Sequence, residues 1–254
     1  MTKTNPTSEP EQSPLLAAAR RHVLRLWNEQ HDVRLVYHNF AQAAAVAELA
    51  GTIARAEALP DDRRELVQLA AWFHNIGYLY DPMQPAETGA IRAEFFLAEQ
   101  KYPGEKIQQV RQIMLGALSE NHPEQEPARI LRDAIRAHDW VETYDTRSPL
   151  LQLEWALLNG QAPDAAGWQE FLQKSLQAPF YTAFAKEKYE PETAVRLLEI
   201  HRQKPAPAGA QAAKKPKDRG EPERFDRLAR RPLRSSIQTY FRANYANHIR
   251  LSAI

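Results

Sequence analysis

The sequence predicts an all-α protein, and three observations support this. Apolar residues recur at helical spacing in nearly every segment between residues 14 and 202. No segment alternates apolar and polar side chains for long enough to form a half-buried strand. Turn-forming stretches such as YPGE, NHPEQEP and NGQAPD separate the periodic segments. We therefore expect a bundle of about eight or nine helices without a sheet.

The first three helices have the clearest signals. Residues 13–30 begin with Ser13 as a candidate N-cap and Pro14 at the first helical position, where its missing N–H costs nothing. Residues 37–58 are rich in Ala and almost uninterrupted. Residues 60–75 carry acidic side chains in their first turn, where the helix dipole favours them.

The turn-forming stretches separate the remaining helices. We expect them over residues 87–101, 104–119, 126–145, 148–159, 164–177 and 190–202. The polar, Pro-containing residues 1–13 are expected to be a disordered N-terminus. A single helical domain over residues 14–202 follows from this division.

Composition narrows the classes of function. The chain has 254 residues, of which 43% are hydrophobic, so it can bury a sizeable core. It contains no Cys, which excludes a disulfide framework, thiolate metal sites and a Cys nucleophile, and which fits a reducing compartment. No run of 18 apolar residues is present, so we expect this chain to be cytoplasmic.

Charge divides the chain into an acidic body and a basic segment. Residues 1–202 carry 28 acidic and 21 basic side chains, whereas residues 203–234 carry 4 and 10. The acidic body argues against nucleic-acid binding. Residues 203–231 are rich in Pro, Ala and Lys and predict a disordered basic linker. Residues 232–254 regain helical spacing and predict an amphipathic helix, with apolar positions at Ile237, Tyr240, Phe241, Tyr245, Ile249 and Leu251.

Two histidines are the first candidates for chemistry. His38 lies at the start of the second predicted helix, and His74 lies at the end of the third. Because two antiparallel helices with a short connection bring these ends together, we expect the two imidazoles to lie close together and to line one cleft with Asn75. A lone histidine is more often a core residue than a ligand, but a pair at facing helix ends favours a shared site.

The stretches LVYHNF, AAWFHNIGYLYDP, YPGEKIQQVRQIM and EWALLNG resemble the HD superfamily of metal-dependent phosphohydrolases, in helix order and spacing over residues 20–200. The resemblance implies hydrolysis of phosphoesters of nucleotides or related compounds. It also implies one or two divalent ions, such as Mn, Mg, Ni or Fe, held by a histidine, a His-Asp pair and a final aspartate. His38 matches the first histidine, and His74 matches the histidine of the pair.

This chain departs from that pattern at the carboxylates. Asn75 stands at the place of the paired aspartate, Ile135 at the place of the final aspartate, and Gln42 where many members have a further histidine. Adjacent divalent ions need anionic oxygens to offset their charge, and a neutral amide and an isoleucine cannot supply it. His38 and His74 alone would hold a transition ion weakly. No cofactor is therefore expected unless the site is active.

Other residues near these positions leave an alternative open. His138 and Asp139 follow Ile135 by three and four positions, on the same helix face, and could form a displaced metal site. Otherwise we expect this pair to have a structural role, as a hydrogen-bonded pair or a surface pair. Asp133 lies about 200° around the helix from Ile135 and should face away. Three arginines could lie near the pocket, although solvated surface positions are expected for each of them: Arg34, Arg132 and Arg136.

The final residues, RSSIQTYFRANYANHIRLSAI, resemble the opening of the membrane-effector domain of Pycsar anti-phage systems. That resemblance implies a response to cyclic pyrimidine nucleotides and a natural chain that continues past Ile254 into membrane-spanning helices at the inner membrane. The basic linker is typical of a cytoplasmic flank that attracts an anionic membrane surface.

The sequence therefore favours a catalytically degenerate HD domain acting as a sensor, scaffold or oligomerisation module for a Pycsar-like effector. The alternative is an active HD phosphohydrolase with an altered metal site. A nucleotide is the ligand class that the resemblance implies, and homo-oligomerisation remains open. A soluble interaction module without a signalling role is the third possibility.

Overall fold

The computed structural model describes residues 13–30, 32–119 and 121–202. Within these ranges it contains nine α-helices and no strand, which confirms the all-α prediction and the expected number of helices. The elements are α1 (Pro14–Glu29), α2 (Phe40–Ala56), α3 (Asp61–Phe73), the 3-10 helix η1 (Ile76–Leu79), α4 (Pro85–Glu99), α5 (Gly104–Leu118), α6 (Glu126–Ala137), the π-helix η2 (His138–Glu142), α7 (Tyr144–Asn159), α8 (Ala165–Gln177) and α9 (Ala183–Arg202).

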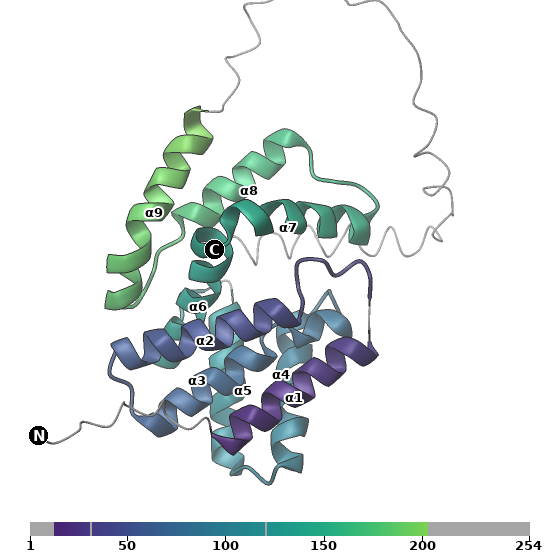
Figure 1. The fold of residues 1–254 in the computed structure, drawn as a ribbon, viewed down its shortest axis with the longest axis vertical. Helices are drawn as coiled ribbons and strands as arrows, with labels where there is room; N and C mark the ends of the chain where they lie inside the picture. Colours follow the sequence, from purple (N-terminus) through teal and green to yellow (C-terminus); the bar gives the residue numbers. More distant parts are fainter. Residues whose placement is uncertain (1–12, 31, 120, 203–254) are drawn as a thin grey trace, which may run out of the picture.

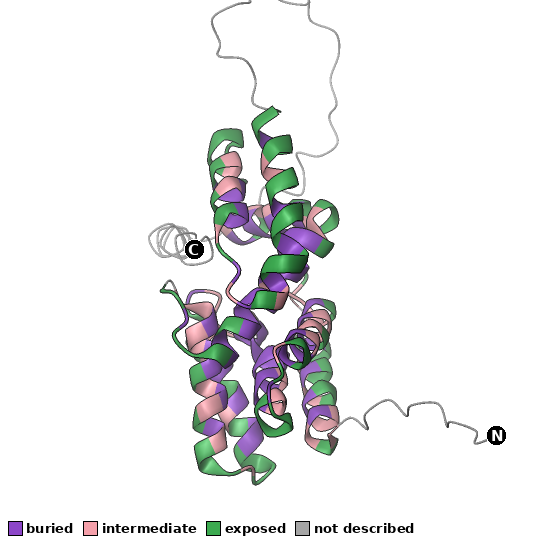
Figure 2. Ribbon diagram, turned by 90° about the vertical axis from the view of Figure 1, so that its left-hand side faces the viewer, coloured by how far each residue is buried: buried purple, intermediate pink, exposed green. Residues whose placement is uncertain are grey.

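The helices form two groups that α6 connects (Figure 1). Helices α1 to α5 pack together in one group, where α2 lies against α3 and α4 lies against α5. Helix α6 contacts α2, α3 and α5, and the chain then continues through η2 into α7, α8 and α9. Buried residues follow the inner faces of these helices and continue through the junction between the groups (Figure 2). One continuous core therefore joins most of the helices.

Local sequence explains where several helices begin and where one of them ends. Asn39 caps α2, because its side-chain oxygen accepts a hydrogen bond from the Gln42 amide nitrogen at 3.0 Å. Asp164 caps α8 in the same way through the Gly167 amide. Pro14 opens α1 as the sequence predicted. Gly160 follows α7 with φ of +73°, the left-handed conformation that favours glycine at a helix C-terminus.

The chain turns sharply between α3 and α4, and Gly77 makes this possible. A Cβ atom built on Gly77 would lie 1.9 Å from the carbonyl oxygen of Pro85. Only the absence of a side chain lets η1 pass this close to the start of α4. The turn places the end of α3, which carries His74, beside the beginning of α4.

One predicted helix is in fact two elements. Residues 126–145 were expected to form a single α-helix, but α6 ends at Ala137 and the chain continues as the π-helix η2. A π-helix adds a residue per turn, so it shifts the register of the side chains that follow it. Asp139 and Trp140 lie in this segment and line the cavity described below. Counting regular α-helical turns from Ile135 therefore does not predict where the side chains of Asp139 and Trp140 lie.

Two helices begin several residues earlier than predicted, and each contains a proline in its first half. Helix α7 begins at Tyr144 rather than 148 and contains Pro149, and α9 begins at Ala183 rather than 190 and contains Pro191. Packing explains the early start of α9, since Ala185 and Tyr189 belong to a second apolar cluster with Phe180. Burial of these side chains offsets the hydrogen bond that a proline removes.

The predictions for residues 1–12 and 203–254 lie outside the described residues. These include the disordered N-terminus, the basic linker and the amphipathic helix. In the part of the chain that the structure describes, no helix combines the length and the apolar character needed to cross a membrane.

Candidate functional site

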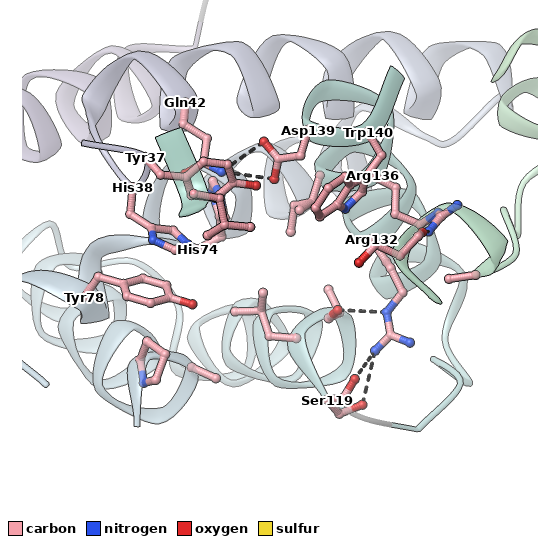
Figure 3. A pocket seen from close by; sticks show the side chains of 18 of the residues that line it. Tyr37, His38, Gln42, His74, Tyr78, Ser119, Arg132, Arg136, Asp139 and Trp140 are labelled. Atoms are coloured by element: carbon pink, nitrogen blue, oxygen red, sulfur yellow. Dashed lines mark hydrogen bonds between the residues drawn. The ribbon is translucent and has the colours of Figure 1, made fainter. Parts of the chain in front are cut away.

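A cavity of about 450 Å³ lies between the two helix groups. It is lined by side chains from the segment before α2, from the ends of α3 and α5, and from α6, η2, α7 and α8. His38, His74 and Ile135 all line it. Figure 3 shows the two histidines and Tyr78 on one side and two arginines of α6 on the other. The volume lies within the range of small-ligand sites.

His38 is held by a buried carboxylate. Its Nδ1 lies 2.5 Å from Glu154 Oε1, and its backbone amide donates to Glu154 Oε2 at 3.0 Å. The amide of Tyr37 donates to the same oxygen at 2.8 Å. Glu154 is fully buried in α7, so this carboxylate fixes the segment before α2 and the imidazole together. The imidazole also stacks on Tyr78, with ring centroids 3.5 Å apart.

His74 is held by the backbone at the end of α3. Its Nδ1 lies 2.7 Å from the carbonyl oxygen of Ala71 and must donate to it, which leaves Nε2 with a lone pair. Nε2 is buried and has no hydrogen-bond partner within the described part of the chain. Burial lowers the pKa of His74 to about 4, and the hydrogen bond to Ala71 only partly opposes this effect. At neutral pH the side chain is therefore an uncharged hydrogen-bond acceptor.

Asn75 takes part in a chain of amide hydrogen bonds. Its Nδ2 donates to the carbonyl oxygen of Asn39 and to Gln42 Oε1, each at 3.0 Å. Gln42 Nε2 in turn donates to both carboxylate oxygens of Asp139 at 3.1 Å. Because a backbone carbonyl can only accept, the donor at Asn75 is required, and an aspartate could not replace it. Asn75 itself is not among the residues that line the cavity, so the prediction that it shares the cleft with the histidines was wrong; its amide is turned toward Asn39 and Gln42 instead.

Arg147 neutralises Asp139. Its Nε donates to Asp139 Oδ1 at 3.2 Å, and one Nη donates to the carbonyl oxygen of Tyr37 at 2.5 Å. The guanidinium also lies over the Tyr37 ring, 4.3 Å from its centroid. Burial raises the pKa of Tyr37, and the negative charge of Asp139 adds to this. The carboxylate of Asp139 therefore already has a cation and an amide as partners.

The other acidic and histidine candidates lie apart from this chain of contacts. His138 does not line the cavity, and its Nε2 is 4.0 Å from Asp139 Oδ1, beyond hydrogen-bond distance. Burial lowers the pKa of His138. Asp133 is fully buried and also absent from the cavity wall. It accepts hydrogen bonds from the amides of Tyr181 and Thr182, just before α9.

The expectation for the arginines was wrong in two of three cases. Arg34 is exposed at the surface and pairs with Asp32. Arg132 and Arg136, in contrast, are only 5% and 7% exposed and line the cavity. The sequence could not show this, because their face of α6 is covered by segments distant in the chain, including α5 and α8.

The donor set does not fit the one or two divalent ions that the HD resemblance implies. Among the described residues, no three His, Asp or Glu side chains gather as a metal site requires. Asp139 already accepts hydrogen bonds from Gln42 and Arg147, so its negative charge is largely balanced without a metal ion. Asn75 presents its amide nitrogen to two oxygens, so only its Oδ1, which is buried and unpartnered, remains as a weak donor.

Two residues that organise the site were not singled out from the sequence. Glu154 is a single carboxylate within the apolar run LLQLEWALL, and such isolation is a signal for a buried acid with a specific partner. Arg147 precedes a proline in a segment that resembles a turn, and no sequence signal points to its role.

No protein-family model matches the sequence, and comparison with curated proteins and with solved structures finds no match.

Proposed function

We propose that residues 14–202 form a degenerate HD-like domain that binds a small ligand in its cavity and acts as a sensor, without metal-dependent hydrolysis. The observation that carries this proposal is the chain of contacts from Asn75 through Gln42 to Asp139, which Arg147 completes. Two amides, Asn75 and Gln42, and the apolar Ile135 stand at the positions where the resemblance places metal ligands, and the one nearby carboxylate, Asp139, is already paired with Arg147. The cavity nevertheless keeps a volume and a mainly apolar lining with a few polar groups, as sites for small ligands do.

Metal content and hydrolysis test the catalytic half of the proposal. We expect the purified chain to contain less than one equivalent of metal by elemental analysis. We also expect no turnover of a nucleotide or a nitrophenyl phosphodiester with Mn, Mg, Ni or Fe. Turnover that requires metal and disappears in His74→Ala would overturn the proposal and establish the hydrolase.

A gain-of-ligand variant sharpens this test. Asn75→Asp combined with Ile135→Asp should raise the affinity for Mn²⁺, because it restores two anionic oxygens. Without metal the same variant should be less stable, since the new carboxylate at position 75 faces two oxygen acceptors. Asn159→Asp is a matched control, because Asn159 also donates to a backbone carbonyl but lies at the end of α7, outside the cavity wall.

One observation favours the alternative of an altered but active site. Both histidines use Nδ1 toward an acceptor, Glu154 for His38 and the Ala71 carbonyl for His74. Metal-bound histidines commonly use their second nitrogen in this way. Calorimetric titration with Mn²⁺, Ni²⁺ and Zn²⁺ decides between the readings. Binding at one equivalent that His38→Ala and His74→Ala both abolish would support the alternative.

Ligand binding tests the sensing half. A ligand present at about one hundred times its Kd stabilises the folded state by about 2.7 kcal/mol, which is roughly 5–10 °C in Tm for a domain of this size. We expect such a shift with at least one compound in a panel of cyclic and linear nucleotides. The shift should persist in a metal chelator, and a shift that the chelator abolishes would contradict a metal-independent sensor.

We also propose that this domain regulates a membrane effector, on the resemblance of residues 232–254 alone. Co-sedimentation with vesicles containing anionic lipid should be stronger for 1–254 than for 1–202. It should weaken at high salt, because screening shortens the reach of the basic segment. Equal and negligible binding by both chains would favour a protein-docking role for that segment.

A further inference from the structure

Three buried arginines border the cavity region, and they differ in how their charge is balanced. Arg147 has the carboxylate of Asp139 as its partner. Arg132 and Arg136 have no Asp or Glu oxygen within 4.0 Å among the described residues. A buried charge without a partner is costly, so each of the two needs an explanation.

Arg132 has a structural explanation. Its guanidinium donates to the carbonyl oxygens of Gly116, Ala117 and Ser119 at the end of α5, as well as to the carbonyl of Asn121. A helix C-terminus carries partial negative charge, which stabilises a cation there. Figure 3 shows the hydrogen bonds from Arg132 to Ser119. Its charge nevertheless remains next to the cavity.

Arg136 is not satisfied in this way. One Nη donates to the carbonyl oxygen of Ser175 at 2.5 Å, and the guanidinium lies over the Phe180 ring. Its Nε and the other Nη are buried and have no hydrogen-bond partner among the residues that the structure describes. Ser175 Oγ, also buried and in the cavity wall, has no partner either. Three hydrogen-bonding groups, two of them on the cationic guanidinium, therefore lack a partner among the described residues at this end of the cavity. Burial lowers the pKa of Arg136 to about 10, and the negative charge of Asp133 partly opposes this, so Arg136 stays charged at neutral pH.

The other side chains that line the cavity indicate which further chemical groups the ligand has. Trp140, Trp155 and Phe171 line the cavity, and the Trp155 and Phe171 ring centroids are 4.9 Å apart. Flat apolar surfaces of this kind bind a planar ring. At the opposite end, His74 Nε2 offers a lone pair to a hydrogen-bond donor. The cavity is thus polarised, with donors at the arginine end and an acceptor at the histidine end (Figure 3).

We infer that the arginine end is an anion subsite, in which Arg136 and Ser175 bind the phosphate, sulfonate or carboxylate of a ligand whose planar body lies against the aromatic wall. Arg132 adds positive potential without donating to the anion. This inference rests on the proposed ligand-binding function and specifies the class and orientation of its ligand.

Two matched fluorescent probes test the subsite on the 1–254 chain. Anilinonaphthalene sulfonate and phenylnaphthylamine share the same aromatic body, but only the first carries an anion. We expect the wild type to bind the sulfonate roughly tenfold more tightly than the neutral probe, as a charge-assisted hydrogen bond provides. Inorganic phosphate should displace the sulfonate and not the neutral probe.

Two variants locate the effect. Arg136→Gln removes the cation, and Ser175→Asp places a carboxylate beside it, so the second variant is informative even if the first folds poorly. Both should reduce the preference for the sulfonate to less than about twofold and leave the affinity for the neutral probe unchanged. Arg129→Gln is the control, because Arg129 lies on the same helix but outside the cavity wall.

The outcomes separate this inference from the proposed function. If the neutral probe binds but the sulfonate gains nothing, or if Arg129→Gln acts like Arg136→Gln, the anion subsite is refuted and the cavity remains a ligand site. If neither probe binds the wild type, the ligand-binding function fails and the subsite fails with it.

Discussion

Glu154→Gln tests whether one buried carboxylate holds the histidine side of the cavity together. The substitution conserves volume, so it creates no cavity and isolates the effect of charge. Glu154 accepts hydrogen bonds from the amide of Tyr37, the amide of His38 and His38 Nδ1, at 2.8, 3.0 and 2.5 Å. An amide can keep its oxygen toward two of these donors, but its NH₂ group then meets the third.

The expected loss follows from these three contacts. A hydrogen bond to a charged group contributes about 1.5–3 kcal/mol and a neutral one about 1, so three bonds lose about 3 kcal/mol in total. The amide avoids part of the desolvation cost of a buried charge, which reduces the net loss to about 2 kcal/mol. For a domain of this size that corresponds to a fall in Tm of about 4–8 °C.

Urea denaturation and differential scanning fluorimetry measure this effect. The control is Glu170→Gln, in which an exposed carboxylate loses its contact with Lys174, 2.8 Å away on the surface of α8. That control should leave Tm unchanged, because solvent screens exposed pairs. A fall of less than about 1 °C for Glu154→Gln, or equal effects of the two variants, would show that the carboxylate does not organise the site.

Three further substitutions test the packing and the buried titrating groups. Gly77→Ala should destabilise the domain by about 3 kcal/mol or more, measured in urea, because the new Cβ clashes with the Pro85 carbonyl. The control, Gly104→Ala, has nothing within 4 Å of its Cβ and should be neutral or slightly stabilising. The pKa of Asp133 is raised from 3.8 to about 6, so the free energy of unfolding should fall by about 3 kcal/mol as pH rises through that window. Asp133→Asn should remove this fall, and a variant that keeps it would contradict the assignment. The pKa of His74 is lowered from 6.5 to about 4, so the stability that neutral His74 provides is present above pH 6.5 and is lost as pH falls, again by about 3 kcal/mol. His74→Gln should abolish this loss of stability. Urea midpoints between pH 4 and 7 will measure it.

The sequence by itself determined the fold class and most of the helices. Helical periodicity is a local property, and N-caps and turns act over a few residues, so Pro14 and the acidic start of α3 marked helix starts correctly. The same local reasoning failed where packing overrides it. Pro149 and Pro191 lie inside helices, because neighbouring side chains are buried against distant elements.

The candidate site was only partly accessible to sequence reasoning. Helix order was sufficient to single out His38 and His74, both of which line the cavity. Asp139 was placed through its spacing from Ile135, but the π-helix after Ala137 changes that register, so its contacts with Gln42 and Arg147 follow only from the fold.

Tertiary structure alone decided the balance of charge in the cavity. Glu154 and His38 are 116 positions apart in the chain, and Arg136 and Ser175 are 39 apart. Whether a buried charge has a partner depends on which side chains the packed helices bring within a few ångströms, and no local pattern encodes that distance. The paired Arg147 and the unsatisfied Arg136 carry the same side chain, and only their surroundings distinguish them.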